Sequence, residues 1–239
     1  MENVDEFERQ TGIVFRDKSL LQRALTHRSF FNESPDIALS DNERLEFLGD
    51  AVLDFLTAEY LYNRFPEMRE GPLTNMRAAL VRREALARFA QELDLGSFLL
   101  LGHGEAETGG RQRQAILAAA FEALVGALYL DQGLQAVESL IKPLMEPHLD
   151  EVRRKALAKD AKSRLQEWSQ AELGRTPRYH TINEEGPDHA KEFTVEVRIG
   201  DVAYGQGHGR SKQAAAQAAA EAALRRLAAN GIQVRPPGS

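Results

Sequence analysis

Three carboxylates within residues 43–50 most constrain how this chain can fold. Glu43, Glu46 and Asp50 are spaced so that a helix returns them to one face. The residues between them are largely apolar, so the same helix needs a core to pack against. Carboxylates seldom enter such a surface unless something offsets their desolvation, and a hard divalent cation does so through oxygen ligands. The stretch therefore predicts either a metal-binding helix face or a solvated acidic stripe beside a core stripe.

Other blocks of the chain favour the metal-binding interpretation. Residues 43–50 resemble the signature of the ribonuclease III family, whose members cleave double-stranded RNA. Further blocks resemble this family and stand in its order, one upstream at 24–29 and three downstream at 70–78, 102–111 and 116–131. The resemblance covers nearly the whole chain, and so many ordered blocks are hard to obtain by chance. It implies the architecture of the bacterial members, a catalytic domain followed by a double-stranded-RNA-binding domain.

The composition agrees with this resemblance. The chain has 239 residues and no cysteine, which excludes disulfides and fits a reducing cytoplasm. The formal net charge is −6, and the acidic excess lies in residues 1–159, which should repel nucleic acid unless metal ions neutralise the acidic groups. The acidic N-terminus lacks the features of a signal peptide. The apolar run 115–130 is interrupted by Glu122 and is short for a membrane span, so we expect a core helix, no membrane and a cytoplasmic location.

The periodicity of the chain changes near residue 155. Before that point it is helical almost throughout. The predicted helices are 20–29, 43–62, 73–92, 115–131 and 134–145. We therefore expect an all-α N-terminal catalytic and dimerisation domain at 1–150, followed by a charged linker at 151–159.

The rest of the chain predicts a small α+β domain at 160–229. It combines helical segments at 163–173 and 214–227 with strands at 193–198 and 202–205. With one more strand, this order resembles the α-β-β-β-α arrangement of a double-stranded-RNA-binding domain, with both helices on one face of an antiparallel sheet. Residues 230–239 contain several Gly and Pro, and we expect them to form a disordered tail.

The resemblance assigns RNA contacts to six residues of the second domain. They are Gln166, Gln170, His189, Arg210, Ser211 and Lys212. The two glutamines lie four apart on one helix face and can donate and accept hydrogen bonds in a minor groove. Ser211 and Lys212 open a helix, where free backbone N–H groups favour phosphate. Each residue alone would be an ordinary surface residue, and the family usually has more basic residues at this helix start, so we expect a weaker, less salt-dependent grip.

A larger departure concerns the last helix of the catalytic domain. Family members carry an aspartate and a glutamate three residues apart there. Glu122 matches the glutamate, but Ala119 occupies the position of the aspartate. The alternative for Glu122 is a buried ion pair with an arginine, although such pairs are costly to form.

The resemblance implies a metal-dependent hydrolysis. Glu46, Asp50 and Glu122 would coordinate Mg²⁺, with Mn²⁺ as a substitute, Ala119 would be the vacant fourth ligand position, and Asp50 and Glu122 would be central to catalysis. Glu43 and Glu70 match further acidic positions near the site. Water would attack the phosphodiester and leave 5′-phosphate and 3′-hydroxyl ends.

Cuts on both strands need two sites, so the resemblance also implies a homodimer. Phe47 matches an aromatic residue that inserts into the partner subunit. The alternative is a core phenylalanine of its own subunit.

Three functions compete at this point. The first is an endoribonuclease that processes ribosomal and other RNA precursors as double-stranded RNA, impaired here by Ala119. The second is a double-stranded-RNA-binding protein that no longer cuts. The third, much weaker, is a metal-dependent hydrolase of a small phosphate compound with an attached RNA-binding module.

Overall fold

The computed structural model describes residues 2–33, 40–187 and 191–232, which form two compact units. The units are Met1–Val152 and Arg153–Ser239. The first unit is all-helical and the second combines helices with a sheet, so the predicted fold class is confirmed. The exact domain bounds given above stay a prediction.

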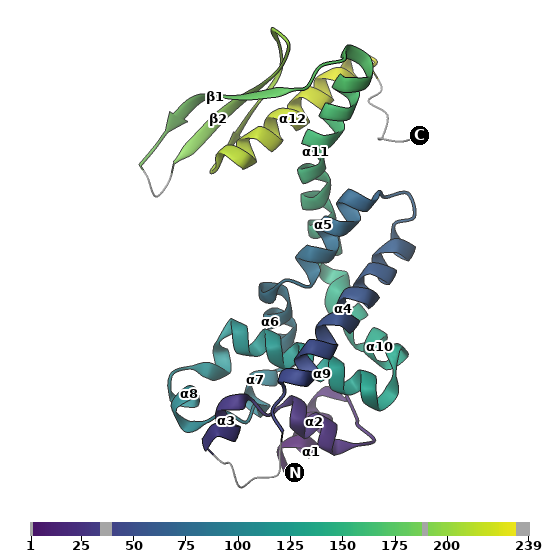
Figure 1. The fold of residues 1–239 in the computed structure, drawn as a ribbon, viewed down its shortest axis with the longest axis vertical. Helices are drawn as coiled ribbons and strands as arrows, with labels where there is room; N and C mark the ends of the chain where they lie inside the picture. The colour runs from purple at the N-terminus through teal and green to yellow at the C-terminus, as the bar shows by residue number, and fades with distance from the viewer. Residues whose placement is uncertain (1, 34–39, 188–190, 233–239) are drawn as a thin grey trace. The chain divides into compact units, whose positions relative to one another are not determined.

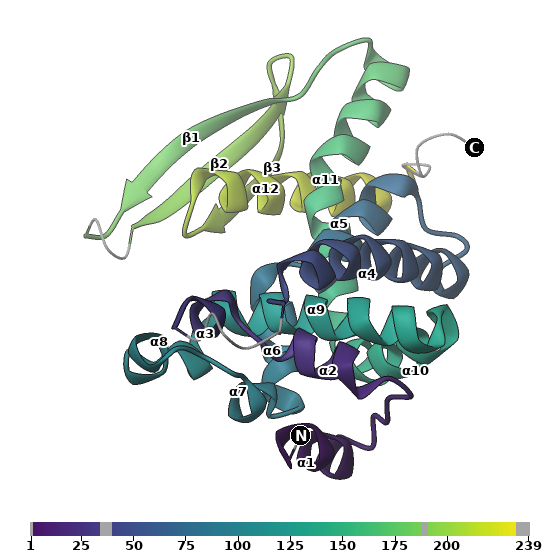
Figure 2. The same cartoon turned by 60° about the horizontal axis from the view of Figure 1, so that its bottom comes forward.

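The first unit consists of short helices around two long ones (Figures 1 and 2). The helices of its first half are α1 (Glu2–Thr11), α2 (Lys18–Ala24), α3 (Arg28–Glu33), α4 (Glu43–Arg64), α5 (Glu70–Leu80) and α6 (Arg83–Glu92). Those of its second half are α7 (Leu95–Phe98), α8 (His103–Glu107), η1 (Gly110–Gln112), α9 (Gln114–Gln132), α10 (Leu134–Met145) and η2 (Glu146–His148). Helix α11 (Leu149–Leu173) begins in this unit and continues into the second.

Two of the predicted helices are interrupted in the structure. The segment 73–92 is split at Arg82, whose extended backbone ends α5 and starts α6. The segment 20–29 is split because Thr26 forms a parallel bridge with Leu100, which takes its backbone out of the helix. The break at Thr26 depends on a partner distant in sequence, which local periodicity does not record.

Helix α9 forms the core of the first unit. Leu117, Phe121 and Leu124 are completely buried, and the helix packs against α4, α6 and α2. Its length and apolar composition would allow a membrane span, and within the described residues it is the only such helix. Most of this helix is buried inside the unit, as expected for a core helix.

Two glycines set the distance between α4 and α9. A Cβ atom at Gly49 would lie 1.8 Å from the backbone oxygen of Glu122. A Cβ atom at Gly126 would lie 2.3 Å from the backbone oxygen of Leu45. Only glycine lets the two helix backbones approach this closely, and the approach places Glu122 beside the turn of α4 that runs from Glu46 to Asp50.

The second unit is a three-stranded antiparallel sheet covered on one face by helices (Figures 1 and 2). Strands β1 (Arg178–Glu185), β2 (Glu192–Ile199) and β3 (Val202–Gly209) follow in chain order, and α12 (Lys212–Ala229) packs on β2 and β3. The core combines alternate residues of β2 with the small residues of α12 and part of α11. The members of β2 are Val195, Val197 and Ile199.

The segment between the domains is helical. Residues 151–159, which we expected to form a linker, lie within α11. At the other end, α12 ends at Ala229, and of the predicted tail only 230–232 belong to the described residues.

Candidate metal centre and RNA-binding surface

Helices α4 and α9 place three carboxyl groups near enough for their charges to act on one another. Burial, followed by the charges of Glu46 and Asp50, raises the pKa of Glu122 to about 7, although the charge of Arg83 acts in the opposite direction. Burial likewise raises the pKa of Glu46, with the charges of Glu43 and Asp50 acting in the same direction. The cluster therefore holds more negative charge than its surroundings neutralise.

The three carboxylates are suitable ligands for a hard divalent cation, although their side chains do not form a closed coordination site in this structure. In the parts of the chain that the structure describes, no three His, Cys, Asp or Glu residues are grouped closely enough to hold a metal ion as they stand. Carboxylates that repel one another separate when no cation is between them, and oxygen ligands are those that Mg²⁺ and Mn²⁺ prefer. The residues present therefore fit such an ion by their chemistry and their common location.

Position 119 contributes no donor to this cluster. Ala119 is half-buried on α9, one helical turn before Glu122, and both neighbouring alanines are buried. Its methyl group can neither bind a cation nor hydrogen-bond a water molecule. The alternative for Glu122, a buried ion pair with arginine, is not supported, because no ion pair of Glu122 occurs among the described residues.

The two further acidic residues lie in different places. Glu43 is exposed at the start of α4, where it pairs with Arg28 at 3.2 Å and acts on the pKa of Glu46. Glu70 begins α5 and lines a hollow between α4 and α5. It is not among the charges that shift the pKa of Glu46 or Glu122. The expected nearness of Glu70 to the cluster stays a prediction.

Helix α4 also presents an aromatic strip to solvent. The side chains of Phe47, Phe55 and Tyr62 are 80%, 54% and 72% exposed, and their spacing places them on one helix face. The interpretation of Phe47 as a core residue of its own subunit is therefore wrong. Phe55 and Tyr62 line the hollow of about 560 Å³ between α4 and α5 that also contains Glu70.

The RNA-contact candidates of the second unit lie on α11 and at the start of α12. Gln166 and Gln170 are exposed on α11. Ser211 is the N-cap of α12, and its hydroxyl accepts a hydrogen bond from the backbone N–H of Ala214 at 3.1 Å. Arg210 precedes it and is exposed, whereas His189 lies outside the described residues.

Lys212 has an unexpected partner. Its Nζ atom lies 2.6 Å from a carboxylate oxygen of Glu184 on β1 and 5.5 Å from the centre of the Phe193 ring. The Lys212 ammonium group lowers the pKa of Glu184, first through their hydrogen bond. A phosphate would therefore compete with Glu184 for this lysine.

Comparison with known proteins agrees with both units. Residues 17–148 match the family model described as ribonuclease-III-like, and residues 161–227 match the double-stranded RNA binding motif. The chain belongs to the ribonuclease III family. A ribonuclease 3 of Roseiflexus sp. (strain RS-1) is 53% identical over 93% of this chain and 94% of its own length. A ribonuclease 3 of Chloroflexus aggregans is 47% identical over 94% of this chain and 97% of its own length.

Solved structures agree for the first unit. The nuclease domain of ribonuclease III from Campylobacter jejuni is 40% identical, with a TM-score of 0.55, over 62% of this chain and 97% of that one. A second structure of that domain, described for flexibility in a region involved in dimer formation, is 39% identical with a TM-score of 0.56 over 62% and 99%.

Membership of the ribonuclease III family makes the chain an endoribonuclease of a class that acts on double-stranded RNA and generally depends on divalent metal ions. The sequence analysis did not predict a role for Arg83, whose charge lowers the pKa of Glu122. Its nearness depends on how α6 packs against α9, so no local signal in the sequence marks it.

Proposed function

We propose that this chain is a metal-dependent endonuclease of double-stranded RNA whose cleavage is strongly impaired by Ala119. The observation that carries the proposal is the cluster of Glu46, Asp50 and Glu122, in which Glu46 and Glu122 are partly buried and the charge of exposed Asp50 raises the pKa of both. Such a cluster is unfavourable by itself and becomes favourable around a cation. With alanine at 119, the cluster has one carboxylate fewer to hold that cation and its water molecules.

The chemistry we propose follows from this donor set. Mg²⁺, or Mn²⁺ in its place, would be held by Glu46, Asp50 and Glu122. When bound, such an ion lowers the pKa of a coordinated water and neutralises charge on the leaving oxygen. The carboxylates of Glu46, Asp50 and Glu122 would orient this water toward the phosphodiester, and the 3′-oxygen would leave. The products would carry 5′-phosphate and 3′-hydroxyl ends. A cytoplasmic location would suit the processing of ribosomal and other RNA precursors.

We further propose that the first unit forms a homodimer. An exposed aromatic strip is otherwise a liability, and Phe47 has the size and exposure of an anchor for the hollow beside Phe55 and Tyr62 on a second copy. In a two-fold arrangement, that contact would bring Glu46 of one copy toward Glu70 of the other, because Glu46 precedes Phe47 and Glu70 lines the hollow. Glu70 would then join the site through the dimer.

The RNA would be held jointly by both units. The second unit supplies the exposed glutamines of α11 and the start of α12, and these would contact the minor groove and the phosphates. The first unit would contribute a metal-dependent part.

The deciding experiment restores the missing carboxylate. Ala119→Asp should raise cleavage of a long RNA duplex with Mg²⁺ by at least about a hundredfold and strengthen Mn²⁺ binding measured by calorimetry. Ala119→Asn is the matched control, because it has the shape of aspartate without its charge, and it should restore little.

Two outcomes would contradict the proposal. Equal, fast cleavage by the native chain and Ala119→Asp at low Mg²⁺ would show that position 119 is no ligand. Tight binding of duplex RNA with no cleavage by either form, even with Mn²⁺, would favour the second candidate, a double-stranded-RNA-binding protein that does not cut. Ala119 is the observation that keeps this candidate open.

A further inference from the structure

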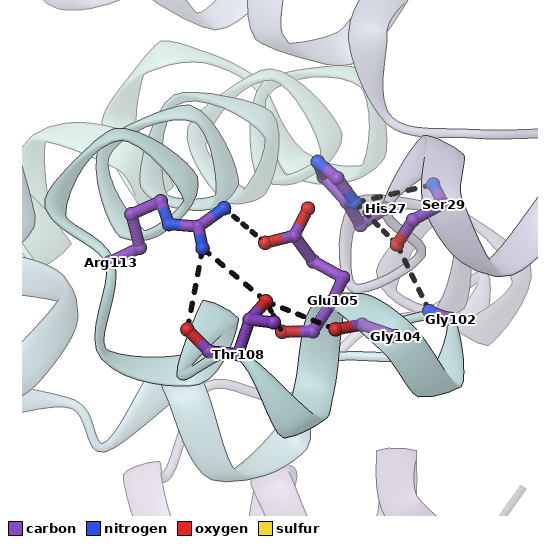
Figure 3. Close-up of polar contacts among 7 residues, drawn as sticks. All are labelled: His27, Ser29, Gly102, Gly104, Glu105, Thr108 and Arg113. Carbon is purple, nitrogen blue, oxygen red and sulfur yellow. Dashed lines mark hydrogen bonds and ion pairs between the residues drawn. The ribbon is translucent and has the colours of Figure 1, made fainter.

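Two sequence blocks without an assigned role, 24–29 and 102–111, meet in the first unit (Figure 3). Their backbones are joined where the first block leaves helix α2. The N–H of His27 donates to the carbonyl of Leu100 at 3.0 Å, and the N–H of Leu100 donates to the carbonyl of Leu25 at 2.8 Å. These two bonds form a short parallel bridge between segments far apart in sequence.

A histidine and a serine extend the bridge toward α8. Nδ1 of His27 lies 2.8 Å from the hydroxyl of Ser29 and accepts from the N–H of Ser29 at 3.2 Å. The N–H of Gly102 donates to the same hydroxyl at 3.0 Å. Since the backbone N–H of Gly102 can only donate, the serine proton is free to point to Nδ1, which places the proton of a neutral imidazole on Nε2.

Glu105 lies between this histidine and the start of α9, as Figure 3 shows. Its carboxylate forms an ion pair with Arg113, the residue that directly precedes α9. Arg113 also donates to the carbonyl and the hydroxyl of Thr108. The Glu105 side chain is only 22% exposed, and its charge opposes the burial that lowers the pKa of His27.

The glycine in the second block is explained by the same contact. A Cβ atom at Gly110 would lie 2.6 Å from the backbone oxygen of Glu105 and 2.8 Å from its Cγ atom. Any other residue there would push Glu105 away. At Gly104, by contrast, an added Cβ atom meets nothing within 4 Å.

The other end of the connection reaches helix α4. Asn42, the residue that directly precedes α4, is 3% exposed. Its backbone N–H donates to the carbonyl of Thr26 at 3.0 Å, and its side-chain amide donates to the carbonyl of Ala24 at 3.2 Å. Hydrogen bonds, the short chain from Gly102 to Glu105 and one ion pair therefore link the residue before α4 to the residue before α9.

We infer that Glu105 and His27 are positioning residues that fix how the first turns of α4 and α9 lie relative to each other. The inference rests on the proposed function, because these helices carry Glu46, Asp50 and Glu122. Their glycine contact at Gly49 and Gly126 sets a distance at one crossing point. The connection between Asn42 and Arg113 is a second constraint away from the crossing point, so it resists rotation of one helix about the other. Carboxylates that repel one another need such resistance to keep the spacing that a cation requires.

The first test measures the helix arrangement without any metal or substrate. The chain has no cysteine, so Arg44→Cys and Gln114→Cys, both at exposed positions near the helix starts, can carry a pair of spin labels. Glu105→Gln should broaden or shift the distance distribution between the labels. Glu107→Gln is the matched control, because Glu107 lies on the same helix but is 67% exposed and pairs with His103.

The glycines give a second matched pair. Gly110→Ala should change the label distances as Glu105→Gln does, because it displaces Glu105, whereas Gly104→Ala should leave them unchanged. Unchanged distances in both Glu105→Gln and Gly110→Ala would overturn the inference, whatever the chain does with RNA.

The second test asks whether the arrangement matters for the cation. In full-length Ala119→Asp, Glu105→Gln should weaken Mn²⁺ binding by about tenfold, as loss of a supporting contact typically does, with little change in the melting temperature. Glu107→Gln should not change it. If Ala119→Asp itself gains no Mn²⁺ affinity, the proposed function fails while the label distances still test the inference. If Ala119→Asp gains Mn²⁺ affinity and adding Glu105→Gln does not lower it, the inference fails while the proposed function stands.

Discussion

The two units use glycine for the same purpose but treat charge in opposite ways. In the first, Gly49 and Gly126 let α4 and α9 touch, and in the second, Gly205 and Gly207 let β3 touch α12. The close approach in the second unit buries alanines and valines and leaves the ionised groups on the surface. In the first unit it also gathers carboxyl groups at the edge of the core.

The pKa values record this difference. Burial and neighbouring carboxylates raise the pKa of Glu122 to about 7, whereas Lys212 lowers the pKa of Glu184. The second unit thus neutralises its acidic group with a side chain of its own. The first unit lacks a sufficient counter-charge within the described part of the chain, which is the expected state of a site that takes its positive charge from an external cation.

The largest expected effect on stability comes from adding a side chain where the glycines let the two helices touch. Gly49→Ala would put a methyl group 1.8 Å from the backbone oxygen of Glu122, so the helices must separate, at a cost of about 3 kcal/mol of unfolding free energy or more. Calorimetry should show the transition of the first unit moving down while that of the second stays in place.

The second unit provides the reciprocal experiment. Gly207→Ala would bring a Cβ atom within 2.1 Å of the backbone nitrogen of Ala219 and should lower only the second transition. Gly104→Ala, with open space around the added atom, should lower neither. If Gly49→Ala melts like the native chain, the close crossing of α4 and α9 is not what holds the carboxylates together.

The sequence predicts those features that depend on neighbouring residues better than those that depend on residues far apart in the chain. The apolar period of α9 and the carboxylate spacing on α4 are local, and both led to the correct helices and to a common face. Strand β1 gave no such signal, because nearly all its side chains are exposed and a bulge between Thr181 and Asn183 breaks its register. Its strand character depends on pairing with β2.

The same limit applies to the candidate site. That Glu46, Asp50 and Glu122 are electrostatically coupled could be expected, because each lies on a long helix whose faces the pattern defines. The location of Glu70 and the pairing of Lys212 with Glu184 could not, since they depend on which surfaces different elements bring together. An exposed charge carries no sequence pattern that identifies its partner.

The opposite pKa shifts predict opposite responses to pH. In metal-free protein, the folded state holds the Glu122 proton up to about pH 7, whereas the unfolded chain loses it near the ordinary value of 4.5. The first unit should therefore lose stability as the pH rises through this window. Its melting temperature with a chelator present should fall by a few degrees between these limits, and Glu122→Gln should flatten the fall.

Glu184 supplies the comparison for this experiment. Because its pKa is lowered, the second unit should gain stability as the pH rises toward the ordinary value for glutamate, and the gain should be small since the group is exposed. Added Mn²⁺ should raise the melting temperature of the first unit most above neutral pH, where Glu122 loses its proton without a cation. A first unit whose metal-free stability rises between pH 5 and 7 would contradict the charge excess inferred here.

The smallest expected effect concerns the grip on RNA. If Lys212 binds a phosphate, it must first leave Glu184, which lies 2.6 Å away. Glu184→Gln removes that competition, so it should raise the affinity for duplex RNA about two- to threefold and steepen its salt dependence by up to about one unit, the contribution of a single phosphate contact. Glu221→Gln is the control, because Glu221 pairs with Arg225 later on the same helix. Titrations at several salt concentrations measure both quantities. A loss of affinity in Glu184→Gln would mean that the ion pair organises the start of α12 for RNA, in which case the second unit, like the first, depends on a carboxylate held in place for its ligand.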